Sequence, residues 1–383
     1  MDDGSTLELD VDLDGRVSTY TNCQLDYSVR HWSDVVPSVC LDPLRDDCKW
    51  IKSQGDKLDS SFFVTADAAP GCDLEALALA IFRRHVRDTS VYSSSGAEWW
   101  VQVRPDTGYA DGDERDTATI PFHWDKDETL AALHGVYVSP HLSTVTYLSD
   151  HGAPTAIIPL RTGIDGGFAE SGGLTSNTMF LSYPRSGKHC CFDGRWLHAA
   201  PRCFDFRAKD SACGPRISLL VNVWLGHVPV GISKFRHAAK CSRALCIPSR
   251  PFELVPATAA LPRLLMVAHA QGDRADSPRL QDVPSAAASS CAADHAVPER
   301  RRKSRRLATR AVEAKSLPRA GPDAADHFVL AHGEMLLTVA IPSCVRTQAS
   351  LALAEAPGPT LACRFDGCSI AIGRGDEALV SIG

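Results

Sequence analysis

The sequence predicts a mainly β protein with flanking helices, built around a sandwich or jelly roll. Between residues 98 and 225, short runs of β-branched, aromatic and aliphatic residues alternate with turn-forming residues, a density that is typical of this fold class. The expected strands cover residues 98–104, 117–125, 142–147, 178–183, 188–192 and 215–225, and the first of them ends at Pro105.

A helix is expected before these strands. Residues 73–82 are good helix formers, and Asp73 is the predicted N-cap. Residues 1–97 are therefore predicted to form an α/β supporting region, and residues 98–232 the β domain. Within that domain, the Gly-rich stretch 161–173 predicts a surface loop.

The composition changes after residue 233. Residues 233–326 are predicted to be a linker, largely of low complexity, because 267–326 are rich in Ala, Arg, Ser, Pro and Asp and contain few large apolar residues. The basic run 299–306 within it is either a solvated charge run or a patch for nuclear targeting or anion binding. Residues 327–383 regain alternation and are predicted to form a small β unit of unknown role.

Composition and charge narrow the class of protein. Apolar residues make up 44% of the chain and charged residues 22%, as in ordinary globular proteins. The net charge of -6 disfavours a generally basic nucleic-acid binder, although a local patch stays open. No apolar run approaches the about 18 residues of a membrane span, and the acidic start MDDGSTLELDVDLDG lacks the pattern of a secretory signal. The chain has 14 Cys without a C-x-x-C pair, so we expect reduced thiols and an intracellular, cytoplasmic location, with nuclear entry left open.

One constellation of polar residues predicts a metal site. His123 and Asp125 lie two apart on an expected strand, so their side chains share one face, and His198 follows a later strand. Two imidazoles and one carboxylate can occupy one face of an octahedral metal and leave three positions open, the arrangement of non-haem Fe(II) oxygenases. We therefore predict that these three residues bind a metal, with His189 as the strongest rival histidine.

The last expected strand divides into two faces. One is aliphatic and consists of Ile217, Leu219, Val221, Val223 and Leu225; the other is mixed and consists of Arg216, Ser218, Leu220, Asn222 and Trp224. We expect the mixed face to line a polar cavity, because Leu220 and Trp224 suit solvent poorly. In such a cavity the guanidinium of Arg216 offers a fork of N–H donors, and with Ser218 it can hold an anion.

Residues 98–228, a third of the chain, resemble the Fe(II)/2-oxoglutarate-dependent dioxygenases, especially their prolyl-hydroxylase-like branch. The motifs that carry the resemblance are His123-Trp124-Asp125, His198, Arg216-Ile217-Ser218, and the segment 143–150 with Tyr147-Leu148 near its end. The resemblance implies a double-stranded β-helix (jelly roll) core with His123, Asp125 and His198 as the Fe(II) ligands. It also implies that Arg216, Ser218 and Tyr147 bind 2-oxoglutarate, and that Arg216 belongs with the three ligands to the catalytic set.

The activity that the resemblance implies is hydroxylation of an unactivated C–H bond by O2, coupled to decarboxylation of 2-oxoglutarate to succinate and CO2. The substrate would be a small molecule or a peptidyl residue. The sequence departs from the family on the substrate side, where Gly152-Ala153-Pro154-Thr155 replaces the more usual Gly-Gly-Glu-Thr and the interval from Asp125 to His198 is long.

Several alternatives stay open. Ascorbate is the alternative cosubstrate, and a non-catalytic jelly roll that binds a metal or a small molecule is the alternative function. A zinc hydrolase would use the same three ligands but would not explain the Arg216-x-Ser218 pair. Trp100, Gln102 and Arg104 share one face and could line the substrate pocket. Nucleic acid is disfavoured as a partner, since the catalytic region lacks a basic stripe, and no membrane partner is expected.

Overall fold

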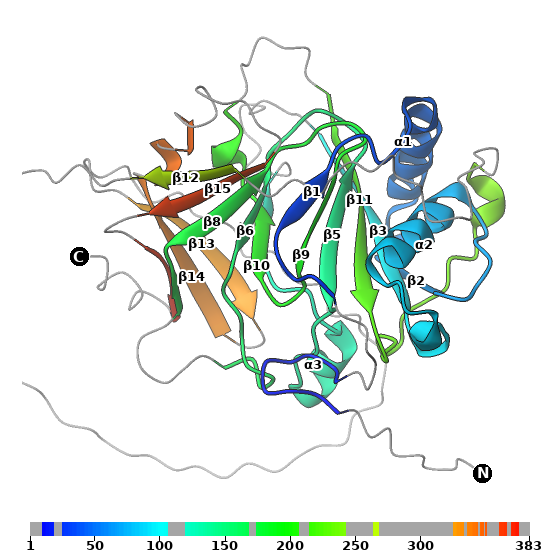
Figure 1. The fold of residues 1–383 in the computed structure, drawn as a ribbon, viewed down its shortest axis with the longest axis horizontal. Helices are drawn as coiled ribbons and strands as arrows, with labels where there is room; N and C mark the ends of the chain where they lie inside the picture. The colour runs from blue at the N-terminus through cyan, green and yellow to red at the C-terminus, as the bar shows by residue number, and fades with distance from the viewer. Residues whose placement is uncertain are drawn as a thin grey trace, which may run out of the picture.

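Two six-stranded β-sheets face each other in the centre of the molecule, as Figure 1 shows. The structure is a computed structural model and describes residues 10–18, 25–105, 119–167, 174–206, 214–242, 263–267, 325–332, 335–343, 345–347, 349–350, 360–365 and 369–374. The first sheet has the order β1 (Arg30–Trp32), β9 (His189–Asp193), β5 (Leu142–Tyr147), β11 (Arg216–Trp224), β3 (Gly96–Arg104) and β2 (Phe62–Thr65). The second has the order β12 (Arg263–Val267), β15 (Thr360–Phe365), β8 (Thr178–Ser182), β6 (Thr155–Ile158), β10 (Leu197–Ala200) and β4 (Ile120–His123).

The central strands follow the path of a jelly roll. In chain order the strands β3, β4, β5, β6, β8, β9, β10 and β11 pass between the two sheets, so that β3, β5, β9 and β11 lie in the first and β4, β6, β8 and β10 in the second. Neighbours among these strands pair antiparallel. This topology confirms the predicted double-stranded β-helix core.

The flanking helices cover the aliphatic face of the first sheet. α1 (Ser38–Ser53) and α2 (Asp73–His85) contact β3 and β11, and Leu219, Val221 and Val223 are buried in the core beneath them. The mixed face of β11 therefore points the other way, into the space between the two sheets, as the sequence predicted. There it meets a smaller apolar cluster that includes Val145, Leu220 and Ile157, which come from both sheets.

Several local predictions were incomplete or wrong. Asp73 is not the N-cap of α2 but its first residue, and among the described residues no side chain caps this end, where Cys72 takes the cap position. The acidic side chains of Asp73 and Glu75 in the first turn still stabilise the helix through their interaction with the positive end of its dipole. The structure adds elements that the sequence patterns did not predict: β1, β2, β6, β7 (Leu174–Ser176), β10, α1, α3 (Glu128–His134), and the short 3-10 helices η1 (Gly55–Lys57), η2 (Thr89–Ser94), η3 (Arg202–Phe204) and η4 (Ala238–Lys240).

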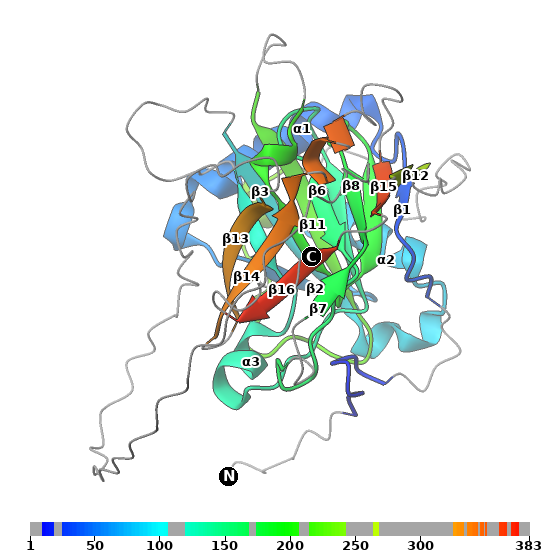
Figure 2. The same ribbon diagram turned by 90° about the vertical axis from the view of Figure 1, so that its left-hand side faces the viewer.

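A third sheet packs against the outer face of the second, and Figure 2 shows it nearest the viewer. Its order is β13 (Ala325–His332), β14 (Met335–Pro342), β16 (Ile370–Arg374) and β7 (Leu174–Ser176). Strands of the predicted C-terminal unit thus join strands of the β domain, since β15 pairs with β8 and β16 with β7, and β12 of the predicted linker pairs with β15. The division into regions 1–97, 98–232, 233–326 and 327–383 stays a prediction. The basic run 299–306 and most of the predicted linker lie outside the described residues.

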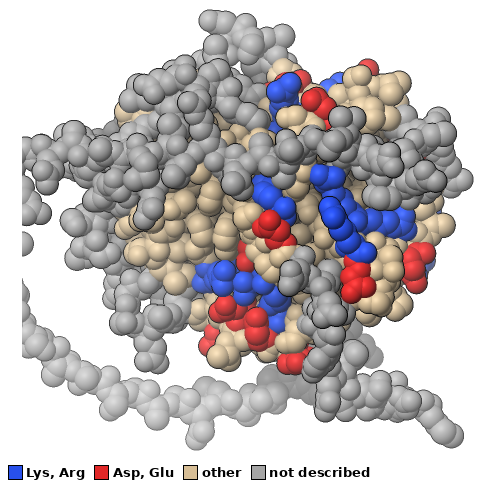
Figure 3. All heavy atoms as spheres, viewed as in Figure 1, with Lys and Arg blue, Asp and Glu red and all other residues tan. Residues whose placement is uncertain are grey.

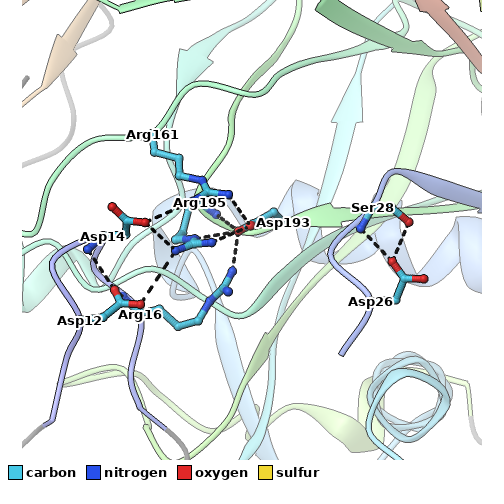
Figure 4. A network of polar contacts seen from close by, with 8 residues as sticks. All are labelled: Asp12, Asp14, Arg16, Asp26, Ser28, Arg161, Asp193 and Arg195. Atoms are coloured by element: carbon cyan, nitrogen blue, oxygen red, sulfur yellow. Dashed lines mark hydrogen bonds and ion pairs between the residues drawn. The ribbon is translucent and has the colours of Figure 1, made fainter. Parts of the chain in front are cut away.

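A network of ion pairs fastens the N-terminal hairpin to one end of the sandwich (Figure 4). Asp193 is 1% exposed and accepts hydrogen bonds from Arg16 Nη2 at 2.7 Å and Arg195 Nη2 at 3.0 Å. Arg195 also donates to Asp14 at 3.2 Å, and Arg161 lies 3.2 Å from the same carboxylate. Residues 10–18 are therefore part of the packed domain.

Among the described helices, none has the length and apolarity that crossing a membrane would require. All eight cysteines that the structure describes carry free thiols, and seven of them are buried.

Candidate functional site

The three predicted metal ligands lie together. His123 on β4 and His198 on β10 are direct partners in the antiparallel ladder, and their ring centroids are 4.3 Å apart. Asp125 follows β4 and places Oδ1 3.7 Å from His123 Nε2 and Oδ2 3.5 Å from His198 Nε2. One donor atom from each of the three side chains lies within 4.8 Å of the other two, the arrangement of a metal site.

Backbone carbonyls fix the tautomers of both histidines. His123 Nδ1 lies 2.8 Å from the carbonyl oxygen of Pro121, and His198 Nδ1 lies 2.9 Å from that of Trp196. Because a carbonyl oxygen only accepts, each Nδ1 carries the proton and each Nε2 keeps its lone pair. Both lone pairs belong to the Nε2 atoms, which face Asp125. A metal-binding histidine commonly donates its other ring N–H to a carbonyl, as both do here.

The charge state of the site also suits a cation. Burial lowers the pKa of His123 to about 4, and the neighbouring His198 adds to this effect, so the His123 imidazole is neutral at pH 7. Burial raises the pKa of Asp125, but His198, His123 and the hydroxyl of Ser143 outweigh burial and hold the pKa below its ordinary value. Neutral imidazole and ionised carboxylate are the forms that bind a metal.

The residues present fit an Fe(II) ion. Two imidazole nitrogens and one carboxylate oxygen are the donor set of non-haem iron sites with open positions. His198 and Asp125 are buried, whereas the side chain of His123 is 36% exposed, so one side of the site is reached from solvent. Ser143 Oγ donates to Asp125 Oδ2 at 2.7 Å and fixes the carboxylate from behind.

The predicted anion-binding residues form a second cluster on the same interior face. Ser218 is the register partner of Tyr147, and Arg216 donates from Nη1 to Ser218 Oγ at 3.1 Å. The guanidinium carbon of Arg216 lies 5.4 Å from the centre of the Tyr147 ring. Thr155 on β6 joins them, because its Oγ1 accepts from Arg216 Nη2 at 3.1 Å and lies 2.7 Å from the Tyr147 hydroxyl.

Most of the guanidinium donors already have protein acceptors. Besides Ser218 and Thr155, Arg216 donates to the Ala153 carbonyl at 3.1 Å and to Gln102 Oε1 at 3.2 Å. Four of the five N–H groups are thereby engaged within the described part of the chain. A carboxylate can bind bidentately only if one of these bonds is exchanged, and the hydroxyls are the acceptors that can rotate away.

The two clusters occupy different levels of one interior. Ser143, beside the triad, and Tyr147, beside Arg216, are four residues apart on β5, which corresponds to roughly 13 Å along the strand. The apolar side chains of Val145 and Leu220 lie between these levels. Phe192 closes one side, with its ring 5.1 Å from that of His198.

The structure separates the rival histidine from the site. His189 Nε2 lies 3.0 Å from His85 Nε2, and His189 Nδ1 lies 2.8 Å from Thr146 Oγ1. Thr146 and Tyr147 point to opposite faces of β5, so His189 belongs to the outer face of the sheet and not to the interior.

Sequence reasoning missed two polar residues of the site: Ser143 and Thr155. Ser143 and Thr155 occupy interior positions of fully buried strands, where a hydroxyl needs a specific partner. A hydroxyl residue within a strand of otherwise buried residues was the feature that could have pointed to both. Trp100, Gln102 and Arg104, the predicted pocket residues, pair with Leu220, Ser218 and Arg216 on the same interior face and are half-buried. Their contact with a substrate stays a prediction.

The described surface shows no basic stripe on the face in Figure 3, where Lys and Arg atoms lie beside Asp and Glu atoms. This mixed pattern agrees with the net charge of -6.

The chain has only distant likeness to known proteins. No protein-family model matches it, and no curated protein matches it. Solved structures that it resembles include a prolyl-4-hydroxylase from Pseudomonas putida, at 14% identity and a TM-score of 0.32 over 52% of this chain and 89% of that one. They also include the non-haem α-ketoglutarate-dependent epimerase SnoN from nogalamycin biosynthesis, at 14% identity and a TM-score of 0.31 over 51% of this chain and 76% of that one. A third is HygX from Streptomyces hygroscopicus with nickel and 2-oxoglutarate bound, at 12% identity and a TM-score of 0.28 over 55% of this chain and 86% of that one. Likeness at this level carries no argument about function.

Proposed function

We propose that this protein is a non-haem Fe(II)- and 2-oxoglutarate-dependent dioxygenase that hydroxylates an unactivated C–H bond of a small molecule or a peptidyl residue. The observation that carries the proposal is the pairing of two clusters in one interior. A triad of two histidines and an aspartate lies at one level, and a buried arginine that has no carboxylate partner among the described residues lies at another.

His123, Asp125 and His198 would hold the Fe(II) ion through Nε2, a carboxylate oxygen and Nε2. Two features of these residues support this role. The Nδ1 protons are held by the carbonyls of Pro121 and Trp196, which leaves the Nε2 lone pairs directed at Asp125. When bound, the ion supplies the redox chemistry that couples decarboxylation of 2-oxoglutarate to oxidation of the substrate by O2.

Arg216 would hold the distal carboxylate of 2-oxoglutarate. The guanidinium is 3% exposed, and within the described residues no Asp or Glu lies within 4.0 Å of it. Its present acceptors are two hydroxyls, an amide oxygen and a backbone carbonyl, all of them neutral. A buried cation is unfavourable without an anion, so a dicarboxylate ligand would complete this part of the site.

The remaining residues position the cosubstrate and exclude water. Tyr147, Thr155 and Ser218 offer hydroxyls around Arg216, and each can donate to a carboxylate once it rotates from its present partner. Val145, Leu220 and Phe192 form an apolar wall along the space between Arg216 and the triad. This wall keeps the space between the clusters dry, which strengthens the charge interactions of the bound diacid.

A jelly roll that only binds a metal is the alternative function. It would account for the triad, but it would leave Arg216 buried without an anion. A zinc hydrolase has the same shortcoming. The dioxygenase is therefore the function that uses both clusters.

The test is succinate formation by the purified 383-residue chain. Wild type supplied with Fe(II), 2-oxoglutarate and O2 should release succinate, and Asp125→Ala should not. Profiling of products made under 18O2, with a cell extract as the source of substrate, should find a labelled hydroxyl. Formation of the labelled hydroxyl with ascorbate and without added 2-oxoglutarate, and without succinate, would point instead to ascorbate as the cosubstrate.

A further inference from the structure

A third group of polar residues lies beside the triad, on the same interior face. Glu98 on β3 and Asn222 on β11 are register partners, and Asn222 is also the register partner of Ser143 on β5. Ser143 donates to Asp125. Glu98 and Asn222 therefore continue, across the sheet, the row of side chains that supports the metal ligand.

The Glu98 carboxylate is held by neutral donors. Its Oε2 accepts from Trp224 Nε1 at 2.9 Å and from Asn222 Nδ2 at 3.4 Å, and the Ser61 hydroxyl also donates to it. No Lys, Arg or His of the described ranges lies within 4.0 Å of it. Burial raises the pKa of Glu98 to about 7, and the charge of Asp125 adds to this effect. The carboxylate would be stabilised by a cation that the described part of the chain does not supply.

Asn222 offers an unused acceptor next to it. Because Nδ2 donates to Glu98, Oδ1 points away from that carboxylate, and it has no hydrogen-bond partner in the described chain although Asn222 is 3% exposed. Leaving a buried amide oxygen without a donor is unfavourable. Glu98 and Asn222 thus offer acceptors to a ligand.

Solvent reaches this part of the interior. Glu98 and Trp100 are half-buried, and the side chain of His123 is 36% exposed. Trp100 lies two residues along β3 on the same face as Glu98, and the face of an indole ring also attracts cations. A ligand that approaches the triad therefore meets an acid, an amide oxygen and an aromatic ring.

We propose that Glu98 and Asn222 form a substrate-recognition subsite, and that the substrate carries an ammonium or guanidinium group close to the carbon that is oxidised. This inference rests on the proposed dioxygenase function and names its substrate class. A cationic nitrogen supplies both the charge that Glu98 lacks and the N–H donor that Asn222 Oδ1 lacks. A neutral hydroxyl would supply only the donor, and a carboxylate would be repelled by Glu98 and Asp125. Trp224 is a positioning residue, since its N–H orients the Glu98 carboxylate.

The experiment measures binding of matched cationic and neutral probes. The full chain, loaded anaerobically with Fe(II) and 2-oxoglutarate, is titrated by calorimetry with L-arginine against L-citrulline, and with L-lysine against L-norleucine, as free amino acids and as N-acetyl amides. We expect at least one cationic probe to bind about tenfold or more tightly than its neutral counterpart, as for hydrogen bonds between charged groups.

Variants assign the preference to the subsite. Glu98→Gln should remove it, and Glu98→Asp, which keeps the charge on a shorter side chain, should retain part of it. Asp42→Asn is the matched control, because this acid of α1 has an 85% exposed side chain that pairs with Arg45. The control should keep the full preference.

Each outcome bears on the inference. Equal binding of all cationic probes and their neutral counterparts, or a preference that survives in Glu98→Gln, would overturn the subsite while leaving the proposed function intact. Failure of wild type to bind Fe(II) and 2-oxoglutarate would overturn the proposed function, and with it this inference.

Discussion

His123 and His198 are partners in the ladder between β4 and β10, and each is bonded through Nδ1 to the carbonyl two residues before it. The same hydrogen bond to a backbone carbonyl thus orients both imidazole rings. Pro121 lies within β4 and Trp196 directly precedes β10, so the pairing of these strands helps to hold both carbonyls in place. The geometry of the two nitrogens is therefore fixed before any metal binds, which favours affinity for an ion of matching geometry.

The first prediction concerns metal stoichiometry. Purified anaerobically, the chain should bind one Fe(II), and His123→Ala or Asp125→Ala should abolish tight binding, because each removes one of three ligands. Iron content by atomic emission, normalised to protein, checks this. His134→Ala, at an exposed histidine of α3, is the control and should retain iron. Full iron retention in both ligand variants would remove the proposed triad.

The second prediction concerns the support of Asp125 by Ser143. Ser143→Ala removes the 2.7 Å hydrogen bond to Asp125 Oδ2, so affinity for Fe(II) should fall by about 10- to 100-fold. Competition with a chelator of known affinity measures the change. Thr144→Val is the matched control, since its hydroxyl lies on the same strand, faces the opposite side and donates to the Val221 carbonyl. Equal iron affinity in Ser143→Ala and Thr144→Val would contradict this role.

The third prediction concerns the pH dependence of stability. Burial raises the pKa of Asp193, but Arg195 and Arg16 outweigh it and hold the pKa below its ordinary value of 3.8. A carboxyl whose pKa is lower in the folded state stabilises the fold above its unfolded pKa, and this contribution is lost as the pH falls through the folded value.

Asp193→Asn should therefore lower the free energy of unfolding by about 3 kcal/mol at pH 7, and by progressively less below about pH 4. Urea unfolding across pH gives both values. Asp46→Asn, which breaks an exposed pair with Lys49, should change stability by less than about 1 kcal/mol. A stability difference for Asp193→Asn that grows as the pH falls would have the wrong sign.

The fourth prediction concerns the thiols. The sequence predicts an intracellular protein with predominantly reduced cysteines, and the described cysteines are free. Thiol counting under denaturing, non-reducing conditions should find most of the 14 Cys reactive. A count that placed most of them in disulfides would argue for an oxidising compartment.

Some elements could be predicted from the sequence because a local pattern of apolar residues determines them. The strand at 142–147 and the inward face of β11 follow from runs of buried residues and from period-two alternation. The predicted roles of His123, Asp125 and Arg216 rest on spacing and resemblance; the structure brings these residues into two clusters, while their roles stay proposals.

Other elements depend on contacts between distant segments. The strand that carries His198 has only four residues, and it is defined by its pairing with β6 and β4. The hydrogen bonds of Thr155 and Gln102 to Arg216 depend on the placement of β6 and β3 beside it. In the sheet that includes β13 and β14, β16 pairs with β7 across about 195 residues of sequence (Ile370 with Ser176), a pairing that no local pattern encodes.

The most direct test of the account is equilibrium dialysis of 14C-labelled 2-oxoglutarate against the anaerobic Fe(II) protein. Wild type should bind one molecule per chain. Arg216→Ala should weaken binding roughly 30-fold or more, since truncating one partner of a buried ion pair loses about 2 to 5 kcal/mol. Arg216→Lys should recover part of the affinity, because it keeps the charge but loses the fork, and iron content should stay near wild type in both. Binding with unchanged affinity in Arg216→Ala, or the absence of binding to wild type, would contradict the central claim that Arg216 anchors 2-oxoglutarate beside the triad.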